Sequence, residues 1–149
     1  MLSLCSLLNA EWNIEKPSKD IPDSIGGSIW GNPFTFGNAE WGDMTLTIRS
    51  NDKMGNWPKS ELMIFIGNKT EQKEWFITSD SSGFNNPHIH MKFGKQGANF
   101  PGILMFTGEY SLYLQVVEKN MDKAVIQIHL SLPDYKKSTL IGTFEAAIK

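Results

Sequence analysis

Apolar and polar residues alternate along several short stretches of the chain. The clearest stretch is Met44 to Arg49, where Met44, Leu46 and Ile48 are apolar and the residues between them are mostly polar. A period of two is typical of a β-strand that buries one face, because successive side chains point to opposite sides of a sheet. The same alternation is present at 88–93, 110–117 and 124–132. We therefore expect each stretch to form a strand with an apolar inner face.

Shorter apolar runs fill the intervals between these stretches. Leu62 to Ile66 is apolar at every position, which predicts a central strand covered on both faces. Turns rich in glycine, proline and asparagine separate the runs at hairpin spacing, and no amphipathic helix of useful length is apparent. The pattern predicts an all-β fold, a single-domain antiparallel β-sandwich of about nine to ten strands. We prefer the sandwich because most strands have one apolar and one polar face.

A β-barrel is the alternative all-β fold. His88 and His90 stand two residues apart on one expected strand, as in cupin-like barrels, but no glutamate follows His90 within the next few residues. Trp30-Gly31 and a length of 149 residues also fit a lipocalin-like barrel that carries a small apolar ligand. The comparable segments are short, so we assign neither family and keep the barrel as an alternative fold.

The first 24 residues are interpreted as a lead-in segment, and residues 25–149 as the β-sandwich domain. Pro17 and Pro22 make residues 11–24 irregular rather than helical. Residues 1–10 are apolar but short, so we interpret them as a packed strand or as the remnant of a signal peptide. Alternatively, they add a strand to a neighbouring copy and form a homo-oligomer. We expect an extracytoplasmic location, periplasmic or secreted, although a cytoplasmic one stays open.

Charge and cysteine content argue against several classes of function. The net charge is -2 and no basic cluster is longer than Lys136-Lys137, whereas nucleic-acid binding normally needs a cationic face. Cys5 is the only cysteine, so the chain has no intramolecular disulfide and no cysteine-based zinc site. The chain has no run of about 18 apolar residues, so the sequence predicts no membrane-spanning helix. Nucleophile elbows, phosphate loops and dinucleotide fingerprints are also absent, so we expect a protein that is not an enzyme.

Three histidines provide the sharpest chemical signal. His88 and His90 share one strand face about 7 Å apart, so both imidazoles can reach one metal ion. His129 is the remaining histidine and completes a three-histidine site if its strand is a neighbour. A divalent-metal protein or metalloenzyme is therefore the alternative function. The competing interpretation is that all three histidines are polar surface residues.

Tryptophan provides the second signal. Trp57 lies in a polar loop beside Asn56, where a flat ring can stack on the apolar face of a sugar. Tyr113 lies on the polar face of its strand and is expected to contribute to the same binding surface. We expect three other tryptophans in the core, since large aromatic side chains are usually buried: Trp30, Trp41 and Trp75. These residues predict a non-enzymatic binding module with carbohydrate as the favoured ligand, or a protein surface as partner.

Acidic residues are scattered over expected turns and strand ends. Asp80, Glu109 and Asp134 are examples. A glycosidase would need two carboxyl groups on opposite sides of one cleft, and the order of residues alone does not show which of them meet.

Overall fold

Every regular element of the structure is a β-strand. The computed structural model describes residues 14, 16–67, 71–81 and 86–149, and none of these residues lies in a helix that could cross a membrane or in any other helix. The strands, in chain order, are β1 (Gly26–Ile29), β2 (Asn32–Pro33), β3 (Phe36–Trp41), β4 (Leu46–Ser50), β5 (Lys53–Met54), β6 (Trp57–Pro58), β7 (Ser60–Ile64), β8 (Glu74–Ile77), β9 (Ile89–Phe93), β10 (Gly102–Phe106), β11 (Ser111–Lys119), β12 (Lys123–Ser131) and β13 (Thr139–Ile148). The prediction of an all-β protein is confirmed.

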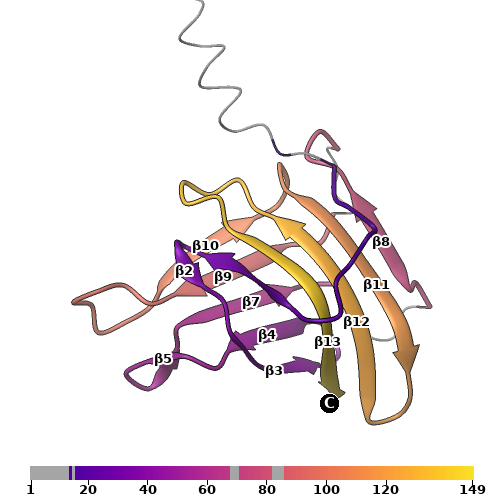
Figure 1. Cartoon of the computed structure of the whole chain (residues 1–149), viewed down its shortest axis with the longest axis horizontal. Coiled ribbons are helices and arrows are strands. Elements are labelled where there is room, and N and C mark those ends of the chain that lie inside the picture. Colours follow the sequence, from indigo (N-terminus) through magenta and orange to yellow (C-terminus); the bar gives the residue numbers. More distant parts are fainter. Residues whose placement is uncertain (1–13, 15, 68–70, 82–85) are drawn as a thin grey trace, which may run out of the picture.

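Eleven of these strands form one strongly curled sheet, a half-barrel (Figure 1). The strand order is β10-β9-β7-β4-β3-β13-β12-β11-β8, and β1 and β2 form a short branch on β13. β5 and β6 make a separate hairpin. The strand pairs are antiparallel except for β13 and β3, which run in parallel where Ile148 lies opposite Trp41. The sheet is therefore mixed, a feature that periodicity along single strands does not reveal.

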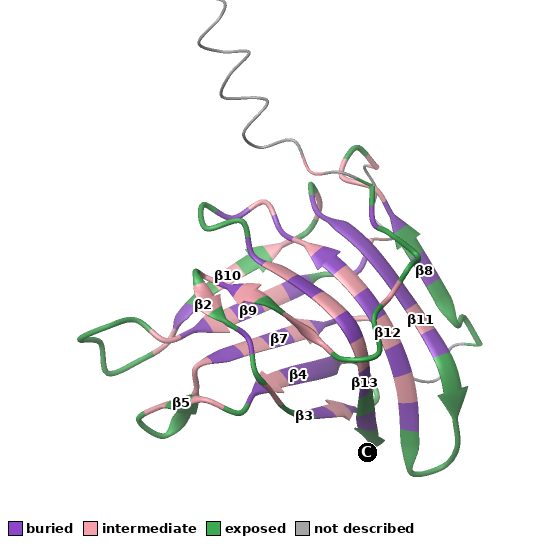
Figure 2. Ribbon diagram, in the orientation of Figure 1, coloured by how far each residue is buried: buried purple, intermediate pink, exposed green. Residues whose placement is uncertain are grey.

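The inner face of the curled sheet contains the hydrophobic core. Alternate residues of β11 and β12 are fully buried, among them Leu112, Leu114, Ile126 and Ile128. Figure 2 shows the resulting alternation of buried and partly exposed positions along β12 and β13. Trp30 stacks on Phe93 with ring centroids 4.3 Å apart, and so the turn after β1 packs against β9. The expected inner faces of β11 and β12 are confirmed. Of the three tryptophans expected in the core, Trp41 and Trp75 lie in it. Trp30 is partly buried and packs against it.

Two details of the strand predictions are wrong. Met44 is 68% exposed, because β4 begins only at Leu46 and Met44 belongs to the preceding turn. The run Leu62 to Ile66 is not covered on both faces, since Met63 and Phe65 are half-buried on the outer side while Leu62 and Ile64 are buried. Because Met63 and Phe65 on the outer side are also apolar, the sequence of this alternating strand looked like that of a strand buried on both faces.

The lead-in before β1 crosses the outer face of the sheet as an irregular segment, which we call the strap (residues 14 and 16–24). Figure 1 shows this indigo segment running across β13 and β12 towards β11 and β8. Two side chains, one on β13 and one in the turn after β8, fix it: Thr143 Oγ1 donates to Pro22 O at 2.9 Å, and Ser79 Oγ donates to Ile14 O at 3.2 Å. The expected irregular lead-in is present, whereas the predictions for residues 1–10 lie outside the described residues.

Candidate functional site

A small cleft lies between the β5–β6 hairpin and the loop that joins β9 to β10. We call it the Trp57 cleft; it has a volume of about 260 Å³ and is lined by residues 54–57, 94–95 and 98–101. The two segments are about 40 residues apart in sequence, so each supplies one wall of the cleft. Their positions follow from the sheet, because β7 and β9 are paired along their whole length.

Backbone hydrogen bonds hold the two walls together. Gly94 N–H donates to Lys59 O at 2.9 Å, which ties the start of the β9–β10 loop to the residue after the hairpin. Lys59 N–H in turn donates to Asp52 O at 2.8 Å and closes the base of the hairpin. Met54 packs directly on Gly94, where a β-carbon would lie only 2.5 Å from the Met54 sulfur. The lack of a side chain at Gly94 therefore lets the hairpin approach the loop.

Two aromatic rings and two amide side chains line the Trp57 cleft. Trp57 is 45% exposed and Phe100 is 75% exposed, so both rings present area to solvent. Asn56 and Asn99 supply amide donors and acceptors, and Lys95 supplies the one charged group among the described residues that line the cleft. This combination of flat apolar surface and neutral hydrogen-bonding groups suits a ligand that has both apolar and hydroxyl faces.

The sequence pointed to Trp57 and Asn56 but missed the opposite wall. Phe100 carries the same signal as Trp57, a large aromatic residue within a polar loop, and that criterion would have identified it. Nothing in the sequence indicated that Asn99 and Lys95 would face the hairpin, because that proximity comes from the pairing of β7 with β9.

Tyr113 does not belong to the Trp57 cleft. It lies on β11 and is only 4% exposed, and its hydroxyl donates to Gln115 Oε1 at 2.6 Å. Lys19 of the strap sits 5.7 Å from the ring centroid. The prediction placed Tyr113 on a polar, ligand-facing surface, but the strap occupies that face of β11.

The histidines lie on two segments, at β9 and on β12, that are not neighbours in the sheet. His90 is on β9 and packs against Phe65 with ring centroids 4.7 Å apart, and His88 is exposed just before that strand. His129 is on β12, between β11 and β13, and its Nδ1 accepts a 2.8 Å hydrogen bond from Ser18 N–H. The condition for a three-histidine site was that the two strands be adjacent, and they are not. Among the residues that the structure describes, no group of three or more His, Cys, Asp or Glu side chains is placed to hold a metal ion.

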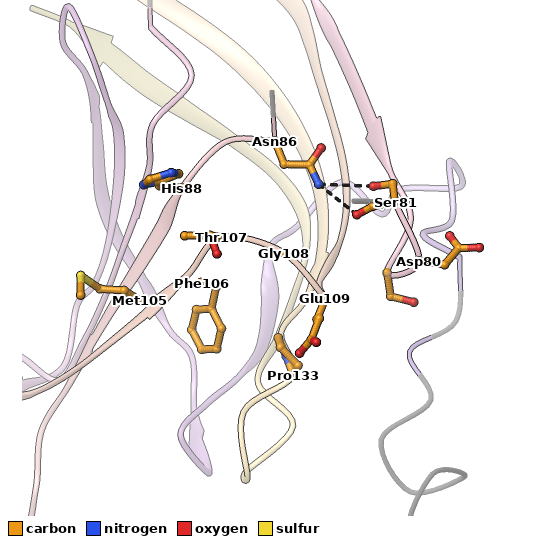
Figure 3. Close-up of a pocket in the computed structure, with 11 residues that line it drawn as sticks. Asp80, Ser81, Asn86, His88, Met105, Phe106, Thr107, Gly108, Glu109 and Pro133 are labelled. Carbon is orange, nitrogen blue, oxygen red and sulfur yellow. Dashed lines mark hydrogen bonds between the residues drawn. The ribbon is translucent and has the colours of Figure 1, made fainter. Parts of the chain in front are cut away.

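A second, larger cavity lies between the two edges of the curled sheet, where residues next to β8 and β10 line it. We call it the seam cavity (residues 79–81, 86, 88, 105–109 and 133); its volume is about 1200 Å³. Residues after β8 line one part and the end of β10 lines another, and these two strands are the ends of the strand path. In the view of Figure 3, His88 and Asp80 lie on opposite sides, with Thr107, Phe106 and Glu109 between them.

Hydrogen bonds fix the walls of the seam cavity. The Tyr110 hydroxyl donates to Pro87 O at 2.5 Å, and burial raises the pKa of this phenol well above its usual range. Asn86 Nδ2 donates to the backbone oxygen and to the hydroxyl of Ser81, both at 3.3 Å. The Thr78 hydroxyl donates to Asp80 Oδ1 at 2.5 Å and lowers the pKa of that carboxyl group. Asp80 is therefore ionised at neutral pH.

The comparisons with known proteins add no relative. No protein-family model, curated protein or solved structure matches the chain.

Proposed function

We propose that the protein is a non-enzymatic carbohydrate-binding module and that the Trp57 cleft holds the sugar. The observation that supports the proposal is the half-exposed ring of Trp57 beside Asn56, opposite Phe100 and Asn99. The C–H faces of a pyranose are apolar and stack on an aromatic ring, whereas its hydroxyl groups need hydrogen-bonding partners at the ring edge.

The size of the cleft limits how much of a glycan it can take. A volume of about 260 Å³ is just below the range of small-molecule sites, which begins at roughly 300 Å³. We therefore propose that the cleft holds one sugar unit, as the end of a chain or as one residue of it. An extracytoplasmic location goes with this proposal, because glycans of envelopes and matrices are encountered there.

The ring of Trp57 is expected to supply much of the affinity. Covering about 100 Å² of its exposed surface at roughly 25 cal/mol per Å² corresponds to about 2.5 kcal/mol. Since about 1.4 kcal/mol is a tenfold change in affinity, removal of the ring should weaken binding by at least about tenfold. Affinity lost on this scale is measurable even for a weak module.

A glycan array followed by calorimetry with the best glycan tests the proposal. We expect array binding by the unmodified protein and a loss of at least about tenfold in affinity for Trp57→Ala and for Phe100→Ala. The matched control is Tyr135→Ala, which removes another exposed aromatic ring from a loop outside the cleft. Circular dichroism of each variant checks that the fold is intact.

Two results would overturn the proposal. One is the absence of binding to any glycan on a broad array. The other is a glycan whose affinity is the same for Trp57→Ala, Phe100→Ala and the unmodified protein, since that glycan would bind elsewhere.

A further inference from the structure

The seam cavity is lined by acidic and apolar side chains. We propose that it binds a ligand with a primary alkylammonium group, such as a diamine or a lysine side chain. The inference is independent of the Trp57 cleft, because no residue lines both spaces.

The first argument is charge. Asp80 and Glu109 both line the seam cavity, and among the described residues that line it there is no lysine or arginine. Both side chains are exposed, so two carboxylates without a lining cation give the mouth of the cavity a negative potential, which concentrates counter-ions of the opposite sign. The net effect favours a cationic ligand over a neutral sugar or an anion.

The second argument is the apolar part of the lining. Phe106, Met105 and Pro133 form it, and Phe106 is only half-exposed. An ammonium group is attracted to the face of an aromatic ring, and a methylene chain packs on such a surface. An alkyl stem and a charged head therefore match the two kinds of lining.

The third argument is that the backbone turn carrying Glu109 is held in a fixed shape. Glu109 has a left-handed backbone conformation, with φ of 63°, although it is not glycine. Such strained positions occur preferentially at functional sites, where the surrounding structure imposes them. Here the buried hydrogen bond from Tyr110 to Pro87 holds the next residue, so the turn that carries Glu109 keeps its shape.

The strap places one competing cation near the site. Lys16 is exposed, and its charge lowers the pKa of Asp80 by less than the hydrogen bonds from the Thr78 hydroxyl and from the backbone of Asp80 do. Its ammonium group partly neutralises the carboxylate that a ligand would use. Removing this charge should tighten ligand binding, whereas removing the carboxylates should weaken it.

Calorimetric titration of the full chain with cadaverine at low ionic strength tests the proposal. We expect cadaverine to bind the unmodified protein saturably. The uncharged diol with the same chain length should not bind. The double variant Asp80→Asn, Glu109→Gln should weaken cadaverine binding by at least about tenfold, and Lys16→Gln should strengthen it by about two- to threefold. The double variant Glu118→Gln, Glu145→Gln, which removes two exposed carboxylates outside the cavity, is the control for net charge and should bind as the unmodified protein does.

A second measurement on the same samples locates the ligand. Nuclear magnetic resonance should show the imidazole signals of His88 moving with cadaverine saturation, while those of His129 stay in place, since His88 alone of the two lines the cavity. Titration with an acetylated, amidated lysine distinguishes the two sources: stronger binding than cadaverine indicates a lysine side chain of a partner, and weaker binding a free amine.

The proposal fails if the unmodified protein does not bind either amine. It fails equally if the Asp80→Asn, Glu109→Gln variant binds cadaverine as tightly as the Glu118→Gln, Glu145→Gln variant does, because the attraction would then be a property of the net charge.

Discussion

At the scale of single residues, His129 shows how a covering segment changes the role of a side chain. The alternation along 124–132 placed it on the polar side, and this is correct for the strand. The strap then covers it, and Ser18 N–H donates to its Nδ1. A nitrogen that accepts a hydrogen bond cannot carry a proton, so neutral His129 with its proton on Nε2 is the form that fits.

This arrangement predicts a loss of stability in mild acid. Burial lowers the pKa of His129 below its ordinary value of 6.5. Between the two pKa values the unfolded chain binds more protons than the folded one, so stability falls as the pH decreases from 6.5 towards the folded-state pKa and is fully present above 6.5. Urea unfolding of the unmodified protein and of His129→Gln across this range should show a steeper loss for the unmodified protein. Equal slopes would contradict the assignment, and His90→Gln serves as the histidine control.

Tyr110 provides a second prediction at this scale. Its hydroxyl bonds to Pro87 O in a buried environment, so Tyr110→Phe leaves a carbonyl group without that partner and should lower the free energy of unfolding by about 1–2 kcal/mol. Tyr113→Phe is the matched control, because that hydroxyl bonds to the partly exposed Gln115 and should cost less than about 0.5 kcal/mol. Chemical denaturation measures both. Equal losses would show that burial of the bond is not what matters.

At the scale of elements, the strap and β13 depend on one glycine. Gly142 has φ of 144°, and a β-carbon there would lie 2.2 Å from Ile25 Cα and 2.3 Å from Ser24 O. Backbone atoms are on the other side of the contact, so rotation of a side chain cannot relieve it. The junction between the strap and β1 must move away from β13 if a larger residue is introduced.

Gly142→Ala should therefore lower the free energy of unfolding by about 1–3 kcal/mol and expose the strap to protease. Gly42→Ala is the control, because a β-carbon at that position would meet no atom within 4 Å beyond its chain neighbours. Limited proteolysis followed by mass spectrometry should find faster cleavage within residues 16–24 for Gly142→Ala only. Unchanged cleavage would show that the strap is held without close contact at Gly142.

Alternation was sufficient to predict the long strands but not their surroundings. Residues such as Leu112 and Ile128 could be placed correctly because a period of two depends only on local geometry. Met44 and Phe65 could not, because the end of a strand and the covering of its outer face are decided by neighbours distant in sequence. The same reason explains Tyr113, whose polar face is covered by the strap.

At the scale of the whole molecule, both candidate sites arise from the arrangement of strands. The pairing of β7 with β9 brings the β5–β6 hairpin to the β9–β10 loop, and the two free edges of the curled sheet bring Asp80 and Glu109 to one cavity. The sequence could supply Trp57 and Asn56 as candidates. It could not show that Phe100 lines the same cleft as Trp57, because strand order depends on contacts between distant segments.

The measurement that tests the central claim most directly is nitrogen-15 nuclear magnetic resonance of the protein titrated with the tightest-binding glycan from the array. The indole N–H signal of Trp57 should shift progressively to saturation, because its ring is half-exposed in the cleft. The signal of Trp41 should stay in place, because that indole is buried and donates to Gly67 O at 3.0 Å. A glycan that moves His88 or other seam-cavity signals while that of Trp57 stays fixed would contradict the account.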